Sequence, residues 1–168
     1  MEQEIRANKW KVLSRLALII FLVVITPFFI AGFYAEGKEY AIFFFVFLVL
    51  LMMPDLVIPV FFMPVSVLLM DNQIVLSYFT GMKKVIATIH LKGYSESKEQ
   101  TSRFKNIQNW YGTILYLQNG DHIHVSGITI DNVTPLKEYL NRKQVQCYGQ
   151  EGVVPPFLFP LNRYKYDK

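Results

Sequence analysis

The sequence has little of what most catalytic, metal-binding and nucleic-acid-binding sites are built from. It holds one cysteine, Cys147, in 168 residues, so no disulfide forms within the chain. Its nine glycines are isolated, which leaves no glycine-rich loop to cradle a phosphate. No run of basic residues is longer than two, and a net charge of +4 is too diffuse to predict nucleic-acid binding.

Charge is also missing from a long stretch near the N-terminus. Residues 16–35 contain no charged side chain, and as a helix they would be about 30 Å long, the hydrocarbon thickness of a bilayer. Hydrophobic residues make up 52% of the chain and charged residues 18%, and the apolar excess lies in residues 12–70. The sequence predicts a retained membrane helix, bent at Pro27, because the apolar run is too long for a cleaved secretory signal.

A second apolar stretch begins near Tyr40, directly after the four polar residues 36–39. So short a loop turns the second helix back, which predicts a two-helix transmembrane hairpin and its N-terminal flank in residues 1–62. The second helix is expected to be broken by Pro54, Pro59 and Pro64 as it leaves the membrane. Asp55 then either lies near the headgroups or is an intramembrane acid, as in a membrane enzyme.

The basic residues set the expected topology of the chain. The N-terminal flank carries four of them, whereas residues 36–39 carry one basic and two acidic residues. The positive-inside rule therefore places both termini and the whole soluble part in the cytoplasm, with the membrane crossed more than once.

From residue 63 on, the apolar pattern changes to a period of two, with turn signals at residues 71–72 and 80–81. This pattern predicts a meander of half-buried antiparallel strands. Residues 94–101 are polar and are expected to form an exposed loop, and Tyr111-Gly112 is expected to end a further strand. Residues 134–142 predict one amphipathic helix with Thr134 as its cap.

The clearest hairpin signal is Asn119-Gly120, which is typical of a two-residue type I′ turn. This turn would place Leu117 opposite His122 and Tyr116 opposite Ile123. The expected core face carries Ile114, Tyr116, Ile123 and Val125, and the expected outward face carries Leu115, Leu117, His122 and His124.

This order of elements resembles the bacterial membrane proteins that carry a pleckstrin-homology (PH)-like domain. The likeness lies in the turn and strand of residues 67–79, the basic strand 83–89, and the segment 116–125 with the closing helix. It implies an α+β membrane protein: after the helical hairpin, a bent antiparallel sheet of six or seven strands over residues 63–143, closed by the C-terminal helix. The resemblance also implies a location at a bacterial inner (cytoplasmic) membrane, and lipid headgroup binding through basic residues early in the sheet, here Lys83 and Lys84.

The remaining candidate groups predict no chemistry. His122 and His124 share a face but lack the further ligands of a metal site, so we expect neither metal nor cofactor. Lys83 and Lys84 either touch anionic lipid or are solvated. No nucleophile–base pair or paired carboxylates can be recognised, which predicts that the chain is not an enzyme.

Residues 144–168 form a tail that is rich in proline and aromatic residues and has no regular period. Its residues Phe157, Leu158 and Phe159 either cover their own domain or dock onto a second protein, with the Leu115/Leu117 face as receiver in both cases. We therefore expect a non-catalytic adaptor that binds a protein partner or subunit at the lipid bilayer. The alternatives are an immunity or inhibitor protein against a toxin and a module that binds anionic lipid.

Overall fold

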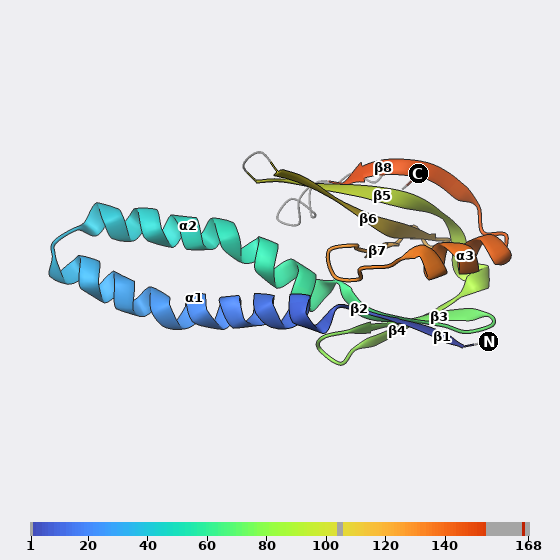
Figure 1. Cartoon of the computed structure of the whole chain (residues 1–168), viewed down its shortest axis with the longest axis horizontal. Helices are drawn as coiled ribbons and strands as arrows, with labels where there is room; N and C mark the ends of the chain where they lie inside the picture. Colours follow the sequence, from blue (N-terminus) through green and yellow to red (C-terminus); the bar gives the residue numbers. More distant parts are fainter. Residues whose placement is uncertain (1, 104–105, 154–165, 167–168) are drawn as a thin grey trace.

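A helical arm projects from a domain built of two β-sheets (Figure 1). The computed structural model describes residues 2–103, 106–153 and 166, with side chains left aside at 51, 54–55, 99–103, 106–110 and 153. The arm consists of α1 (Lys9–Ala35), α2 (Glu39–Val57) and the π-helical turn η1 (Ile58–Phe62). The predicted α+β class is confirmed.

The first sheet is antiparallel throughout and contains both chain segments that flank the arm. Its strand order is β1-β2-β3-β4. The strands span Gln3–Arg6 (β1), Pro64–Leu69 (β2), Gln73–Tyr78 (β3) and Lys83–Ala87 (β4). The predicted meander with turns at 71–72 and 80–81 is confirmed, but β1 lies in the flank where the sequence indicated no strand.

The second sheet follows the short helix η2 (Thr88–His90) and has the order β7-β6-β5-β8, with β8 parallel to β5. Its strands are β5 (Leu91–Arg103), β6 (Asn106–Leu117), β7 (His122–Val125) and β8 (Cys147–Val153). The loop predicted over 94–101 and the break predicted at Tyr111-Gly112 are therefore wrong. β8 likewise corrects the prediction that the tail has no strand.

The predicted register of the β6–β7 hairpin is also wrong. Tyr116 pairs with His122 and Leu115 with Ile123, one residue away from the predicted pairing. In the loop, Gly120 has a φ of 88°. The Asn119 side chain accepts a hydrogen bond from the Asp121 amide at 3.1 Å. The loop thus has three residues with glycine in the left-handed position. The one-residue shift exchanges the two faces of β6, whereas Ile123 and Val125 of β7 lie on the core side as predicted.

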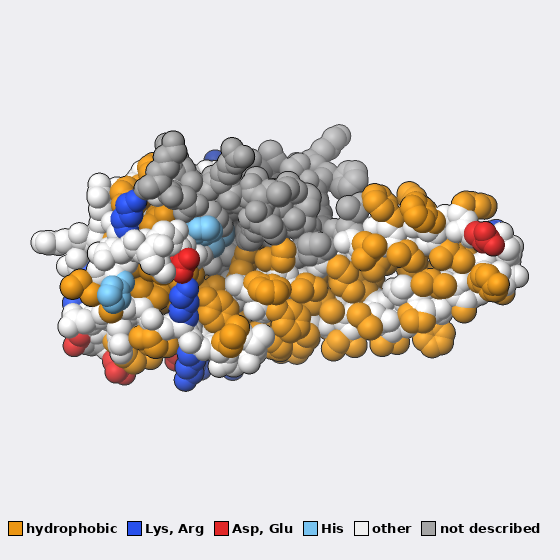
Figure 2. Space-filling model, turned by 180° about the vertical axis from the view of Figure 1, so that it is seen from behind, with side chains coloured by type: hydrophobic (Ala, Val, Ile, Leu, Met, Phe, Trp, Pro, Cys, Tyr) orange, Lys and Arg blue, Asp and Glu red, His pale blue; other side chains and the backbone are white. Residues whose placement is uncertain are grey.

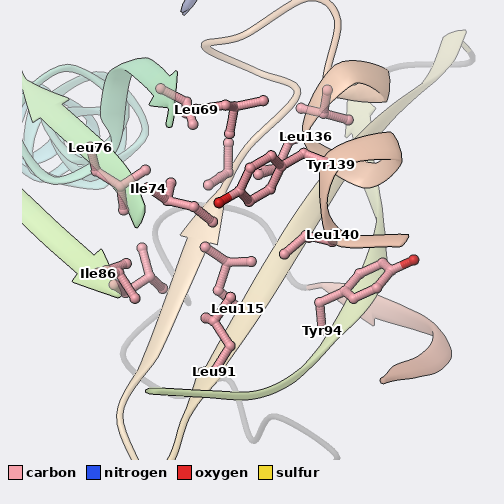
Figure 3. Packing of buried hydrophobic residues seen from close by; sticks show 14 of the residues in the cluster. Leu69, Ile74, Leu76, Ile86, Leu91, Tyr94, Leu115, Leu136, Tyr139 and Leu140 are labelled. Atoms are coloured by element: carbon pink, nitrogen blue, oxygen red, sulfur yellow. The ribbon is translucent and has the colours of Figure 1, made fainter. Parts of the chain in front are cut away.

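The core fills the space between the two sheets and α3 (Thr134–Arg142), which closes the domain. Figure 3 shows residues of both sheets converging on Leu136, Tyr139 and Leu140 of α3. The predicted helix is confirmed. Thr134 is its first residue and not its N-cap, which is Val133. The Thr134 amide donates a hydrogen bond to the Asn132 side chain at 3.0 Å. Fully buried core residues include Val67, Leu69, Ile74, Leu76, Leu115, Val125 and Ile130.

The arm has an almost wholly apolar surface (Figure 2). None of the residues of α1 is buried, so α1 is not the core helix of a water-soluble domain. Of the helices described, α1 alone is long and apolar enough to cross a membrane by its length and composition, and the described apolar stretch of α2, Glu39–Leu50, is shorter. α2 continues past Pro54 to Val57, so a break at Pro54 is wrong, but the α-helix does end just before Pro59, and β2 begins at Pro64. The Asp55 side chain lies outside the described part.

Candidate functional site

The arm and the domain are joined at both ends of the arm. β1 ends at Arg6, and two residues later Asn8 is the N-cap of α1. At the other end of the arm, a single residue separates η1 from β2. β1 and β2 pair with each other, and the Ala7 amide extends this ladder by donating to the Val65 carbonyl at 2.7 Å. The two covalent links into one sheet leave the arm little freedom to move against the domain.

A polar clamp fixes the base of α1 to the loop that precedes α3. The Asp131 carboxylate accepts hydrogen bonds from Lys11 and from the Asn8 side chain, the latter at 2.8 Å. These donors, with Lys11 the stronger, hold the pKa of Asp131 below its ordinary value. The Arg15 guanidinium donates to the Ile128 carbonyl at 3.4 Å. Sequence inspection gave no signal for this clamp, because its partners lie 120 or so residues apart in the chain.

The two lysines proposed for lipid contact lie at the start of β4, and both are exposed. They directly follow the β3–β4 turn, which is closed by a hydrogen bond from the Tyr78 amide to the Met82 carbonyl at 2.9 Å. Phe79 and Met82 of this turn are 43% and 63% exposed, although both are large and apolar. Phe79 meets Phe61 of η1 edge to face with ring centroids 5.7 Å apart, so the turn rests against the base of the arm.

The four residues predicted to share an outward face are separated by the structure. Leu115 and Leu117 are buried in the core between the sheets, which removes them as an exposed partner surface. His122 and His124 lie on the other side of the second sheet, where His122 is exposed and His124 is buried. Phe157, Leu158 and Phe159 lie outside the described residues.

A buried polar cluster lies on that same outer side of the second sheet. The Ser97 hydroxyl and His124 Nε2 are 3.0 Å apart. His124 pairs with Ile114 and Ser97 with Gly112, so the imidazole reaches Ser97 across a position that has no side chain. Ser95 and Tyr116 both donate to the Glu151 carboxylate.

The serine–histidine pair has the composition of an activated nucleophile. Both residues are buried, however: 1% of the surface of Ser97 and 9% of the surface of His124 is exposed. Beside them Tyr116, Tyr148 and Tyr166 pack together, with the rings of Tyr148 and Tyr166 stacked at 4.8 Å. The arrangement is that of a buried polar layer under aromatic rings. The sequence gave no signal for it, because the pairing of Ser97 with His124 depends on the register of three strands.

A cavity of about 360 Å³ opens elsewhere, between the start of α3 and the loop before it. The two charged residues that line it each form a salt bridge with another side chain. Asp131 belongs to the clamp on α1, and the Lys137 ammonium pairs with the Glu96 carboxylate at 3.1 Å. The lining also includes Tyr111, Gly127, Asn132, Val133 and Thr134.

Within the part of the chain that the structure describes, no three histidine, cysteine, aspartate or glutamate side chains lie close enough to hold a metal ion. Comparison of the chain with protein-family models, with curated proteins and with solved structures gives no match.

Proposed function

We propose that this protein is a non-catalytic, two-pass membrane protein whose PH-like domain is held rigidly at the bilayer and serves as an interaction module for a protein partner. The observation that carries the proposal is the pairing of β1 with β2. These strands flank the entire arm, so residues 3–6 and 64–69 must lie on the same side of any membrane.

The pairing limits how many times the chain can cross. If α1 crosses the bilayer, the chain must return before β2, and α2 with η1 is the only segment available for the return. α1 has 27 residues, and α2 and η1 have 19 and 5. At about 1.5 Å per residue these segments are roughly 40 Å and 35 Å long, and a hydrocarbon core is about 30 Å thick. Both lengths support a membrane hairpin.

Contacts inside the arm support the same proposal. Phe29 of α1 and Phe45 of α2 stack with ring centroids 5.0 Å apart, and Phe33 contacts Phe45 edge to face at 6.3 Å. The helices are therefore packed against each other, while their outer surfaces stay apolar and exposed. Exposed apolar surface of this extent supports a lipid environment for the arm.

The order of the strands supports the PH-like part of the proposal. β2–β4 form one antiparallel sheet, β5–β7 a second, and α3 follows to close the core. The resemblance implied one bent antiparallel sheet of six or seven strands with a closing helix; the six consecutive strands β2–β7 are instead divided between two sheets, and α3 closes them as the resemblance implied. β1 and β8 are additions at the edges, and they tie the arm and the residues after α3 into the domain.

The non-catalytic part of the proposal is supported by the hydrogen bonds and the burial of the polar side chains that could act in catalysis. The Asp131 carboxylate is held by donors from the base of the arm, the Glu151 carboxylate by Ser95 and Tyr116, and the Ser97–His124 pair is buried. With Leu115 and Leu117 in the core, the partner contacts proposed from the sequence reduce to His122 on the surface of β7 and to Phe157, Leu158 and Phe159.

Alkaline carbonate extraction tests the membrane part, because only lipid-embedded protein stays in the pellet. Release of the intact chain into the supernatant would overturn it. Co-purification from mild detergent tests the partner part, with wild type compared against a variant in which Phe157, Leu158 and Phe159 are replaced by serine. We expect the variant to lose a stoichiometric partner; equal recovery would remove these residues from the interface.

A further inference from the structure

The β3–β4 turn combines exposed apolar side chains with two adjacent lysines. Phe79 and Met82 are apolar and exposed, the adjacent Val85 is 59% exposed, and two lysines stand between Met82 and Val85. No ion pair engages Lys83 or Lys84 among the described residues. An apolar tip next to unpaired positive charge matches the boundary between acyl chains and anionic headgroups.

The position of the turn points to the same partner. Figure 1 shows the β3–β4 turn at the end of the domain where the arm begins, whereas the β2–β3 turn lies at the opposite end. The contact between Phe61 and Phe79 fixes this placement. Phe62 of η1 is 70% exposed and Trp10 of α1 is 81% exposed, and tryptophan is enriched where helices leave a bilayer.

We propose that the β3–β4 turn is a second membrane contact that inserts Phe79 and Met82 into the headgroup region of an anionic bilayer. This inference rests on the proposed membrane hairpin. The arm brings the turn to the surface, so insertion needs no independent affinity for lipid. Lys83 and Lys84 then bind anionic headgroups electrostatically and hold the domain in one orientation. The surface consists of Trp10, Phe62, Phe79, Met82, Lys83 and Lys84.

The test uses the full chain with Cys147→Ser, so that a single new cysteine carries a polarity-sensitive fluorophore. Met82→Cys labels the turn, and Asn72→Cys labels the exposed β2–β3 turn at the other end of β3 as a matched control. Each protein is reconstituted into vesicles of phosphatidylcholine alone or of phosphatidylcholine with phosphatidylglycerol. We expect a blue-shifted emission from Met82→Cys that is larger in the anionic vesicles, and water-like emission from Asn72→Cys in both.

The lysines are tested by adding Lys83→Gln and Lys84→Gln to the labelled Met82→Cys protein. Each lysine should contribute roughly fivefold to the ratio of inserted to free turn, equivalent to about 1 kcal/mol. The double variant should therefore lose the difference between anionic and neutral vesicles. A water-like Met82 label in anionic vesicles overturns the inference, as does a shift that is unchanged in the double variant.

Two further outcomes are separated by the same samples. A blue shift that follows protein concentration and not lipid composition would assign the turn to contact with a second copy and overturn the lipid contact. Carbonate extraction of these vesicles tests the membrane hairpin on its own. If the protein is retained but the fluorophore on Met82→Cys shows water-like emission, only the insertion of the turn is overturned. If the protein is released, the proposed function is overturned.

Discussion

Ile5 of β1 lies directly opposite Val67 of β2, although the entire helical arm separates the two residues in the chain. Both side chains belong to the core between the sheets. The arm is thus not a flexible tether at one end of the domain. Its two ends are neighbouring strands of one sheet, and the position of the arm is a property of the fold.

Shortening the Ile5 side chain should therefore destabilise the whole first sheet. We expect Ile5→Ala to lower the free energy of unfolding by about 2 kcal/mol, because it removes buried methyl groups and leaves a cavity. Glu4→Ala at the exposed neighbouring position is the control, with an expected change within about 0.5 kcal/mol. Urea unfolding in mild detergent, followed by circular dichroism, measures both. Equal stability of the two variants would mean that β1 does not hold the arm to the sheet.

The clamp between Asp131 and α1 should make stability depend on acid. The pKa of Asp131 is lowered in the folded state, so its contribution is complete above the ordinary aspartate pKa and is lost as the pH falls through the folded-state pKa. Because the carboxylate is partly exposed, we expect Asp131→Asn to cost about 0.5–1 kcal/mol at neutral pH and to flatten the acidic part of the stability profile. Glu138→Gln, an exposed change on α3, should keep the wild-type profile. A wild-type acid dependence in Asp131→Asn would show that the clamp is not formed.

Gly127 is required by the close approach of β6. A Cβ atom at this position would overlap the Tyr111 carbonyl oxygen and lie 2.9 Å from the carbonyl carbon. We expect Gly127→Ala to destabilise the domain by about 1–3 kcal/mol, because backbone must move on one side or the other. Gly152→Ala is the matched control, since a Cβ there meets no atom of the described residues within 4 Å. Thermal unfolding midpoints that fall together in both variants would contradict this packing.

The Ser97–His124 pair distinguishes a structural role from a catalytic one. A buried, structural Ser97 should not react with a fluorophosphonate probe, and Ser97→Ala should lower stability by about 1–2 kcal/mol through the loss of one buried hydrogen bond. Mass spectrometry of the probe-treated full-length protein gives the direct answer. Probe attached to Ser97 in the native protein would contradict the non-catalytic proposal.

The sequence predicted best those parts whose signal is local. The meander β2–β4 follows from alternating apolar residues between two turn signals, and α3 follows from its apolar stripe. α1 follows from an uninterrupted apolar run, although the structure begins it at Lys9, seven residues before that run. In each case the residues that decide the structure lie next to one another in the chain.

The errors arose where distant contacts overrode a local preference. Ser95 and Ser97 read as an exposed loop, yet they lie in β5 because Glu151 and His124 satisfy their hydroxyls. Asn119-Gly120 predicted a type I′ turn, but the Asn119 side chain bonds the Asp121 amide and the loop takes three residues. That single residue moved Leu115 and Leu117 from a predicted binding face into the core.

The sequence predicts only the basic part of the candidate surface. Lys83 and Lys84 stand out in the sequence as basic residues of a strand, whereas Phe79 lies at the end of an alternating apolar pattern that does not show whether it is exposed. Only the contact of Phe79 with Phe61 places the turn beside the arm. Whether a large apolar residue faces the core or the surroundings depends on tertiary placement, which no local pattern encodes.

The most direct test of the account is the sidedness of three positions in sealed membrane vesicles. In the Cys147→Ser background, single cysteines at Gln3 in β1, Lys38 in the turn of the arm and Glu138 on α3 are reacted with a membrane-impermeant maleimide before and after permeabilisation. The account predicts that Gln3→Cys and Glu138→Cys react on one side and Lys38→Cys on the other. Reaction of all three cysteines on the same side, or of Gln3→Cys and Glu138→Cys on opposite sides, would contradict it.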